Sequence, residues 1–181
     1  MRGVTTRALV LVITLGLGTA AAEMPATGTD GPRFRDNGDG TITDTRTSLV
    51  WEKLSDDDSI HDKDKKYPWP ETIAKIRALN GASFAGHNDW RLPTVDELAA
   101  IAKRGQRPAI DAIFDTNCVA KCTVLTCSCN MPSLYWSSTT YKADSAIAGA
   151  LDFRNGFVDS PDRPNNNFVR AVRGGTAAAS R

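Results

Sequence analysis

The chain has little of what several classes of protein require. Its 181 residues include 22 basic and 21 acidic side chains, so it lacks the basic excess that non-specific binding of nucleic acid needs. It has two histidines, no glycine-rich phosphate loop and no serine in a nucleophile elbow. Beyond the N-terminal segment, no apolar run approaches the roughly 20 residues of a membrane-spanning helix. We therefore expect neither a nucleic-acid-binding protein, nor an integral membrane protein, nor an enzyme.

Residues 1–22 have the pattern of a secretory signal peptide. Arg2 and Arg7 supply the positive charge, residues 8–17 form a short apolar run, and residues 20–22 are all alanine, which favours cleavage after Ala22. The apolar run is too short for a membrane anchor, and no cysteine follows the cleavage site to carry a lipid. Removing the two arginines leaves 20 basic against 21 acidic residues. We expect a periplasmic or secreted protein.

The rest of the chain is long enough for one domain with its own core. Residues 23–32 are rich in Gly, Pro, Thr and Asp and are expected to form a flexible leader, whereas residues 176–181 are expected to be a disordered tail. The domain is then expected to occupy residues 33–175.

Strands are expected on both sides of this domain's helices. Asn-Gly and Asp-Gly dipeptides in residues 37–40 predict a β-hairpin, and counting back from Gly40 puts Arg35 at the first ligand position of an EF-hand loop, which rules that loop out. Further strands are expected at residues 47–53, 134–141, 146–153 and 168–173. The last of these carries an arginine on each face, so at least one of Arg170 and Arg173 should be partly buried and paired with a carboxylate.

Two helices are expected. Residues 70–80 form the first, with Ile73, Ile76 and Leu79 as its core stripe and Lys75 facing solvent. The second begins at the capping box formed by Thr94 and Glu97. Its apolar face is then expected to contain Leu98, Ile101 and Ala102.

Every cysteine lies in one short segment: Cys118, Cys122, Cys127 and Cys129. Four thiolates so close together could bind zinc. However, an even number of cysteines in a secreted chain favours disulfides, and we expect two. The pairing that joins Cys127 to Cys129 is the least favoured of the three, because so short a ring is strained.

Residues 55–66 form an acidic loop without periodicity. Asp58, Asp62 and Asp64 could supply oxygen ligands to calcium, the one cofactor that the sequence suggests. The alternative is a solvated loop in which the lysines within residues 63–66 balance the charge.

Five short motifs, in this order, resemble the Lcl C-terminal domain family, which is named for a bacterial collagen-like adhesin. They are Phe34–Thr41, Leu49-Val50-Trp51, Asp89–Thr94, Tyr135–Thr139 and Val169–Gly174. The segment from Arg91 to Glu97 also resembles the formylglycine-generating enzymes, whose fold is related to that of C-type lectins. The resemblance implies an α+β domain of C-type-lectin-like type, with two main helices, a mixed and mostly antiparallel sheet, and long loops.

The same resemblance implies a scaffold without the enzymes' activity. Those enzymes use a cysteine pair near the C-terminus for oxidation, whereas the C-terminal strand of this chain has no cysteine. An oxidoreductase or hydrolase that reuses the fold is the weaker alternative.

The resemblance to the adhesin, whose domain binds sulfated glycosaminoglycans, implies a module that recognises a glycan, including a sulfated one, or a protein of the envelope or of a host surface. A structural or protein-interaction module of the envelope is the other reading. The loop at residues 159–167, with the turn that precedes it, offers polar side chains for recognition. The candidate ligand-binding residues are Arg154, Asn155, Arg163, Asn165, Asn166 and Asn167. The oligomeric state is left open.

Overall fold

The structure, a computed structural model, describes residues 31–140, 148–160 and 165–175. The chain divides into two units, residues 1–31 and 32–181, and the elements described below all belong to the second. The expected signal peptide, most of the leader and all of the tail lie outside the described residues. No helix among the described residues has both the length and the apolar content that crossing a membrane requires.

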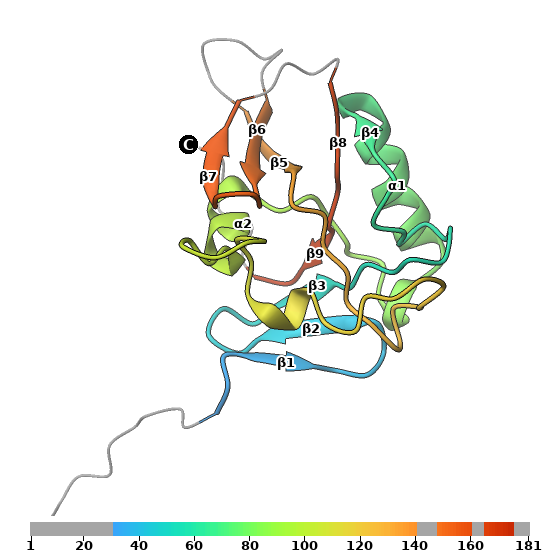
Figure 1. The fold of residues 1–181 in the computed structure, drawn as a ribbon. Helices are drawn as coiled ribbons and strands as arrows, with labels where there is room; N and C mark the ends of the chain where they lie inside the picture. The colour runs from blue at the N-terminus through green and yellow to red at the C-terminus, as the bar shows by residue number, and fades with distance from the viewer. Residues whose placement is uncertain (1–30, 141–147, 161–164, 176–181) are drawn as a thin grey trace, which may run out of the picture. The chain divides into compact units, whose positions relative to one another are not determined.

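The described residues form an α+β domain of two α-helices, two short 3-10 helices and nine short strands (Figure 1). In chain order these are β1 Phe34–Asp36, β2 Thr41–Asp44, β3 Leu49–Glu52, β4 Tyr67–Pro68, α1 Trp69–Gly81, η1 Phe84–Gly86, α2 Val95–Ile101, η2 Ala112–Phe114, β5 Leu134–Thr140, β6 Ala148–Asp152, β7 Phe157–Asp159, β8 Asn166–Asn167 and β9 Val172–Arg173. The strands pair antiparallel in three sheets, in the orders β1-β2-β3-β9, β4-β8 and β5-β6-β7. The predicted α+β class, with two main helices and mostly antiparallel strands, is confirmed.

The first sheet contains the predicted hairpin. Residues 37–40 connect β1 to β2, and β3 then pairs with β2 on the side away from β1. Phe34 and Trp51 both pack edge-on against Phe114 of η2, with ring centroids 5.2 and 6.2 Å apart. Such edge-to-face pairs stabilise a core beyond the area that they bury. The sheet is therefore fixed to the middle of the chain by aromatic packing.

Helix α1 begins and ends close to the predicted residues, but its buried face is different. Ile76 and Leu79 are buried as expected, whereas Ile73 is 44% exposed. Lys75, which we expected in solvent, is buried instead. Its ammonium lies 3.1 Å from Oε1 of Glu52 and donates to the carbonyl of Val169. A buried charge needs such partners, and they come from segments far away in the sequence.

Helix α2 begins at the predicted capping box. The Thr94 hydroxyl accepts from the Glu97 N–H at 3.2 Å, and the Glu97 carboxylate accepts from the Thr94 N–H at 2.8 Å. Leu98 and Ile101 are buried, and the helix contacts the sheet β5-β6-β7. This places the C-terminal end of α2 close to the turn between β6 and β7.

The C-terminal segment is not the single strand that we predicted over residues 168–173. Only Val172–Arg173 forms a strand, β9, which pairs with β3, while Asn166–Asn167 forms β8, which pairs with β4. The expectation for the arginines is confirmed by Arg173, whose partly buried side chain has its guanidinium 2.7 Å from Asp89. Arg170 is fully buried and donates to the main-chain carbonyls of Glu52 and Cys129.

Two disulfides join Cys118 to Cys129 and Cys122 to Cys127. The predicted disulfide cluster is thereby confirmed, and the observed pairing is not the one that would join Cys127 to Cys129. All four sulfur atoms are used, so none is available as a zinc thiolate. The bridged segment packs on the main core through its buried half-cystines.

Candidate ligand-binding surfaces

Beyond the end of α2, the chain turns back on itself. The N–H of Lys103 donates to the carbonyl of Ala109 at 3.1 Å, which closes the intervening residues into a loop. The N–H of Ala109 donates in turn to the carbonyl of Phe153 at 2.7 Å. These bonds hold the loop, which carries Arg104 and Arg107, against the turn that joins β6 to β7.

The turn between β6 and β7 has a fixed geometry of its own. The N–H groups of Arg154 and Gly156 both donate to Asp152, and the side chain of Asn155 accepts from the N–H of Phe157 at 2.9 Å. Gly156 has a φ of +78°, and a Cβ there would lie 2.9 Å from Cγ of Arg104. Only glycine combines this backbone conformation with so close an approach.

The loop and the turn border two adjoining hollows that are open to solvent, of about 430 and 450 Å³, both lined by Arg107 and Arg154. We call the pair the arginine hollow. Its remaining lining residues are Gly105, Gln106, Pro108, Pro132 and Asn155. Each volume falls in the range of known ligand sites, which is roughly 300–1,000 Å³.

The charge of the arginine hollow is positive. Arg154 forms a bidentate ion pair with Asp152, and its hydrogen bonds outweigh the effect of burial and hold the pKa of Asp152 below its ordinary value. Arg104 donates to the Gly156 carbonyl at 3.0 Å and lies over the ring of Phe157. Arg107 is exposed and has no hydrogen bond or ion pair within the described residues. The lining of the hollow thus contains two guanidinium groups and no carboxylate, while Asp152 and, more weakly, Asp159 act on Arg154 from outside the lining.

The structure separates the ligand-binding residues predicted from the sequence. Arg154 and Asn155 line the arginine hollow, while Arg163 lies outside the described residues. Asn165 to Asn167 lie at or in β8, next to β4, and Asn167 is buried there. In Figure 1, the turn between β6 and β7 lies at the lower end of the sheet β5-β6-β7, whereas β8, which belongs to another sheet, starts near the top of the view. The six residues therefore do not form one site.

Arg104 and Arg107 were not among the predicted binding residues. Three basic residues, Lys103, Arg104 and Arg107, lie close together around Gly105. This clustering of basic residues could have indicated a binding site. No local pattern, however, indicates that these residues lie against the turn at Arg154.

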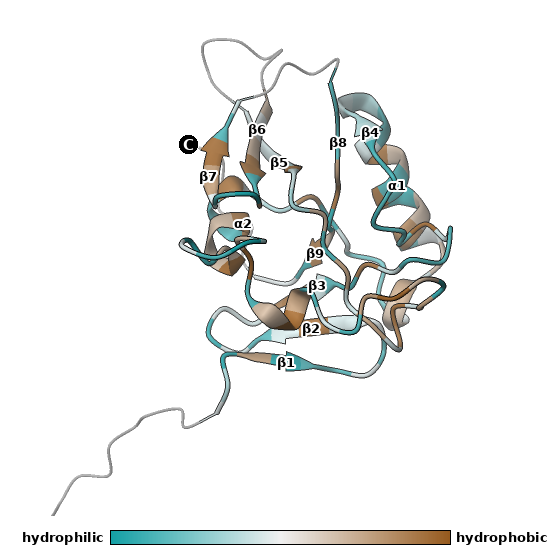
Figure 2. Ribbon diagram, viewed as in Figure 1, coloured by the Kyte–Doolittle hydropathy of each residue, from teal (hydrophilic) through white to brown (hydrophobic). Residues whose placement is uncertain are grey.

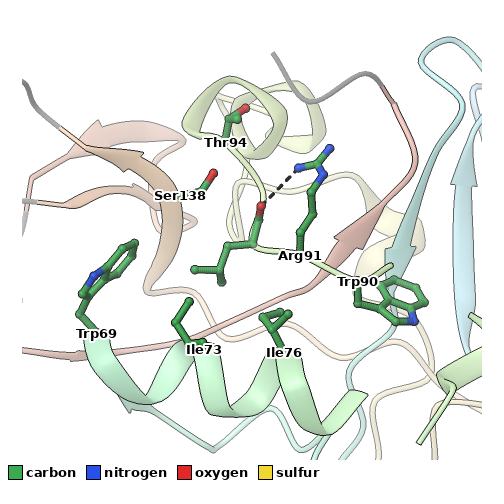
Figure 3. A pocket seen from close by; sticks show the side chains of 8 residues that line it. Trp69, Ile73, Ile76, Trp90, Arg91, Thr94 and Ser138 are labelled. Atoms are coloured by element: carbon green, nitrogen blue, oxygen red, sulfur yellow. Dashed lines mark hydrogen bonds between the residues drawn. The ribbon is translucent and has the colours of Figure 1, made fainter. Parts of the chain in front are cut away.

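A second hollow, of about 320 Å³, lies between α1 and the segment that leads into α2 (Figure 3). Trp69, Ile73 and Ile76 project into it from α1, and Thr94 and Ser138 lie on the opposite side. Trp90, Arg91 and Leu92 complete its lining. The hollow is mainly apolar, and the exposed side chain of Ile73 belongs to it.

The polar groups around this second hollow are engaged with one another. Both terminal nitrogens of Arg91 donate to the carboxylate of Glu97, at 2.7 and 2.8 Å, and one also donates to the carbonyl of Gly174. The N–H and hydroxyl of Ser138 both donate to the carbonyl of Pro93. These bonds hold the start of α2 against β5 and the C-terminal segment, and so indicate a structural role.

The acidic loop brings together a different set of carboxylates from the one predicted. Carboxylate oxygens of Asp56, Asp62 and Asp64 lie within 4.8 Å of one another, whereas the carboxylate of Asp58 pairs with Lys121 at 2.7 Å. The ammonium of Lys63 lies 2.7 Å from Asp64 and 3.5 Å from Asp56. A lysine therefore neutralises part of this cluster, which supports the solvated-loop alternative. Calcium binding stays a prediction.

The site and the fold together define an α+β domain with long loops and two disulfides. A positively charged hollow lies beside the sheet β5-β6-β7. The Lcl C-terminal domain family matches residues 40–173, which is most of the chain. The chain belongs to this family. No curated protein gave a significant match. The kinship with C-type lectins stays a prediction.

Proposed function

We propose that this chain is a non-enzymatic binding module outside the cytoplasm that recognises a sulfated glycan through the arginine hollow. The observation that carries the proposal is the exposed guanidinium of Arg107, which has no partner within the described residues and shares both hollows with Arg154. A guanidinium presents paired N–H donors that match the oxygens of a sulfate group. Membership of the Lcl C-terminal domain family is consistent with an adhesin-like role.

The neighbouring side chains suit the neutral part of such a ligand. Gln106 and Asn155 line the hollow and carry amide groups that can bond to sugar hydroxyls. Pro108 and Pro132 add apolar surface on the other side of Arg107. Because Asp152 already neutralises much of the charge of Arg154, we expect Arg107 to contribute more to affinity than Arg154 does.

Calorimetric titration of the mature protein with a heparin-derived oligosaccharide and with its desulfated counterpart tests this proposal. We expect binding of the sulfated form alone, with an affinity that falls as salt screens the charges. Arg107→Ala should weaken binding at least about tenfold, which corresponds to 1.4 kcal/mol. The control is Arg77→Ala, which removes an exposed arginine from α1. Equal binding of the desulfated form, or an unchanged affinity of Arg107→Ala, would overturn the proposal.

The proposal includes the absence of catalysis. Both disulfides together use all four cysteines, which leaves no thiol for the oxidation chemistry of the formylglycine-generating enzymes. Incubation with a cysteine-containing peptide under oxygen should leave the peptide's mass unchanged. Conversion of that cysteine to an aldehyde would show that the domain is an enzyme after all.

A protein-interaction module of the envelope is the second candidate. Val119 and Leu125 favour it, since both are apolar, more than 60% exposed and part of the disulfide-bonded segment. Cross-linking in envelope extract separates the candidates. A product lost in Leu125→Ser and kept in Arg107→Ala would favour the protein partner.

A further inference from the structure

Among the described residues, strand β7 is an edge strand of its sheet, with no strand paired on its outer side. It is the outer strand of the order β5-β6-β7, and all three of its residues are exposed. Phe157 is 56% and Val158 45% exposed, and Figure 2 colours most of β7 as hydrophobic. Proteins usually protect an edge strand with charges, prolines or a covering segment, because its free backbone groups can pair with another chain. An apolar edge is therefore a candidate interface.

The register shows which backbone groups of β7 are free. The carbonyl of Asp152 accepts from Gly156 and so faces β7, while the N–H of Phe153 faces the opposite way. Successive residues of a strand alternate in this respect. Since Asp152 lies opposite Phe157, the backbone of Phe157 faces β6, and that of Val158, the next residue, faces outward. Val158 thus offers one donor and one acceptor to an added strand.

We propose that β7 pairs antiparallel with β7 of a second copy of this chain, with Val158 opposite Val158 of the partner subunit. The twofold axis would pass between these two residues. Each Val158 N–H would donate to the carbonyl of the partner's Val158, and the two side chains would bury each other on one face. Such a contact is isologous, because the same strand serves on both sides.

Charge complementarity selects a second copy as the occupant. In this register, Phe157 lies opposite the partner's Asp159, and side chains that lie directly opposite point to the same face. The guanidinium of Arg104 lies on that face, 4.7 Å from the centre of the Phe157 ring. The partner's Asp159 would therefore reach Arg104, and the symmetry repeats this ion pair. Each copy of the chain therefore carries both halves of the complementary pair, with Asp159 on β7 and Arg104 in the loop after α2.

Sedimentation velocity over a series of concentrations tests the dimer. We expect a monomer–dimer equilibrium that becomes detectable within a concentration series extending to about 1 mM. Val158→Pro removes only an outward-facing N–H and should keep the fold, checked by circular dichroism, while raising the dissociation constant at least about tenfold. Asp159→Arg should do the same by placing like charges together. The control Glu71→Arg makes the same change of charge on α1 and should dimerise as the parent does.

A charge exchange gives the sharper test. The double variant Arg104→Asp with Asp159→Arg restores the ion pair in reverse, so we expect it to dimerise more tightly than Asp159→Arg alone. A monomer throughout the concentration series would overturn the proposal. So would a dissociation constant in both Val158→Pro and Asp159→Arg that equals that of the parent protein. Val158→Pro should still bind the sulfated oligosaccharide, which keeps this proposal separate from that of the arginine hollow.

Discussion

Lys75 and Glu52 form an ion pair whose side chains are almost completely shielded from solvent, with Nζ and Oε1 3.1 Å apart. The same oxygen of Glu52 lies 2.8 Å from Nδ1 of His61, and its other oxygen accepts from the N–H of Ala171. The main-chain carbonyl of Glu52 accepts from Arg170. This cluster joins β3, α1, the acidic loop and the C-terminal segment. None of its charged side chains lines either of the hollows described above, so we assign it a structural role.

Removing one partner of this pair should destabilise the domain strongly. Glu52→Ala leaves the buried ammonium of Lys75 without a carboxylate, and such a change typically costs about 3–5 kcal/mol. Urea unfolding, followed by tryptophan fluorescence, gives the difference in free energy. Glu97→Ala, which breaks a partly exposed pair with Arg91, should cost less. Equal losses in the two variants would contradict the importance of burial.

The same carboxylate predicts how stability depends on pH. Burial opposes its ionisation, but Lys75, His61 and the Ala171 N–H outweigh burial and lower the pKa of Glu52 to about 2. A group whose folded-state pKa lies below its unfolded value stabilises the protein above the unfolded pKa, and this contribution is lost as pH falls through the folded one. We expect unfolding free energy to decrease between about pH 4.5 and 2. Glu52→Gln should flatten this part of the profile, and an unchanged slope would contradict the assignment.

The capping box at the start of α2 should be measurable on its own. Thr94→Ala removes the hydroxyl that accepts from the Glu97 N–H, and loss of an N-cap side chain costs about 1 kcal/mol. Thr94→Ser keeps the hydroxyl and should be close to the parent protein. Thermal unfolding compares the three proteins. If Thr94→Ser is as unstable as Thr94→Ala, the methyl group and not the cap is responsible.

The disulfides should be required for full stability. The bridge from Cys118 to Cys129 closes the longer of the two loops, so the double variant Cys118→Ser with Cys129→Ser should lose more stability than the pair Cys122→Ser with Cys127→Ser. We expect a loss of about 2–5 kcal/mol for the first pair. Alkylation of the unreduced protein followed by intact-mass measurement should show no added label. A labelled thiol would show that at least one of the two bridges is not formed.

Local patterns in the sequence were sufficient where a few adjacent residues decide the structure. The glycine turns of residues 37–40 and the capping box at Thr94 satisfy their own backbone groups within one turn, so they form the same structure in many tertiary contexts. The proximity of four cysteines likewise predicted two disulfides, although it left the pairing open. Two of the family motifs, Phe34–Thr41 and Asp89–Thr94, coincide with the glycine turn and with the residue that caps α2.

Long-range contacts decided the rest. Lys75 carries no local signal for burial, and only Glu52 and the Val169 carbonyl, brought to it by folding, offset the cost of removing its charge from water. Arg107 and Arg154 belong to different elements, and the hydrogen bond from Ala109 to Phe153 makes them neighbours. The sequence by itself determined the fold class, the caps and turns, and the disulfide cluster. The tertiary structure decided which charges are buried and which arginines share a hollow, because both depend on partners that are distant along the chain.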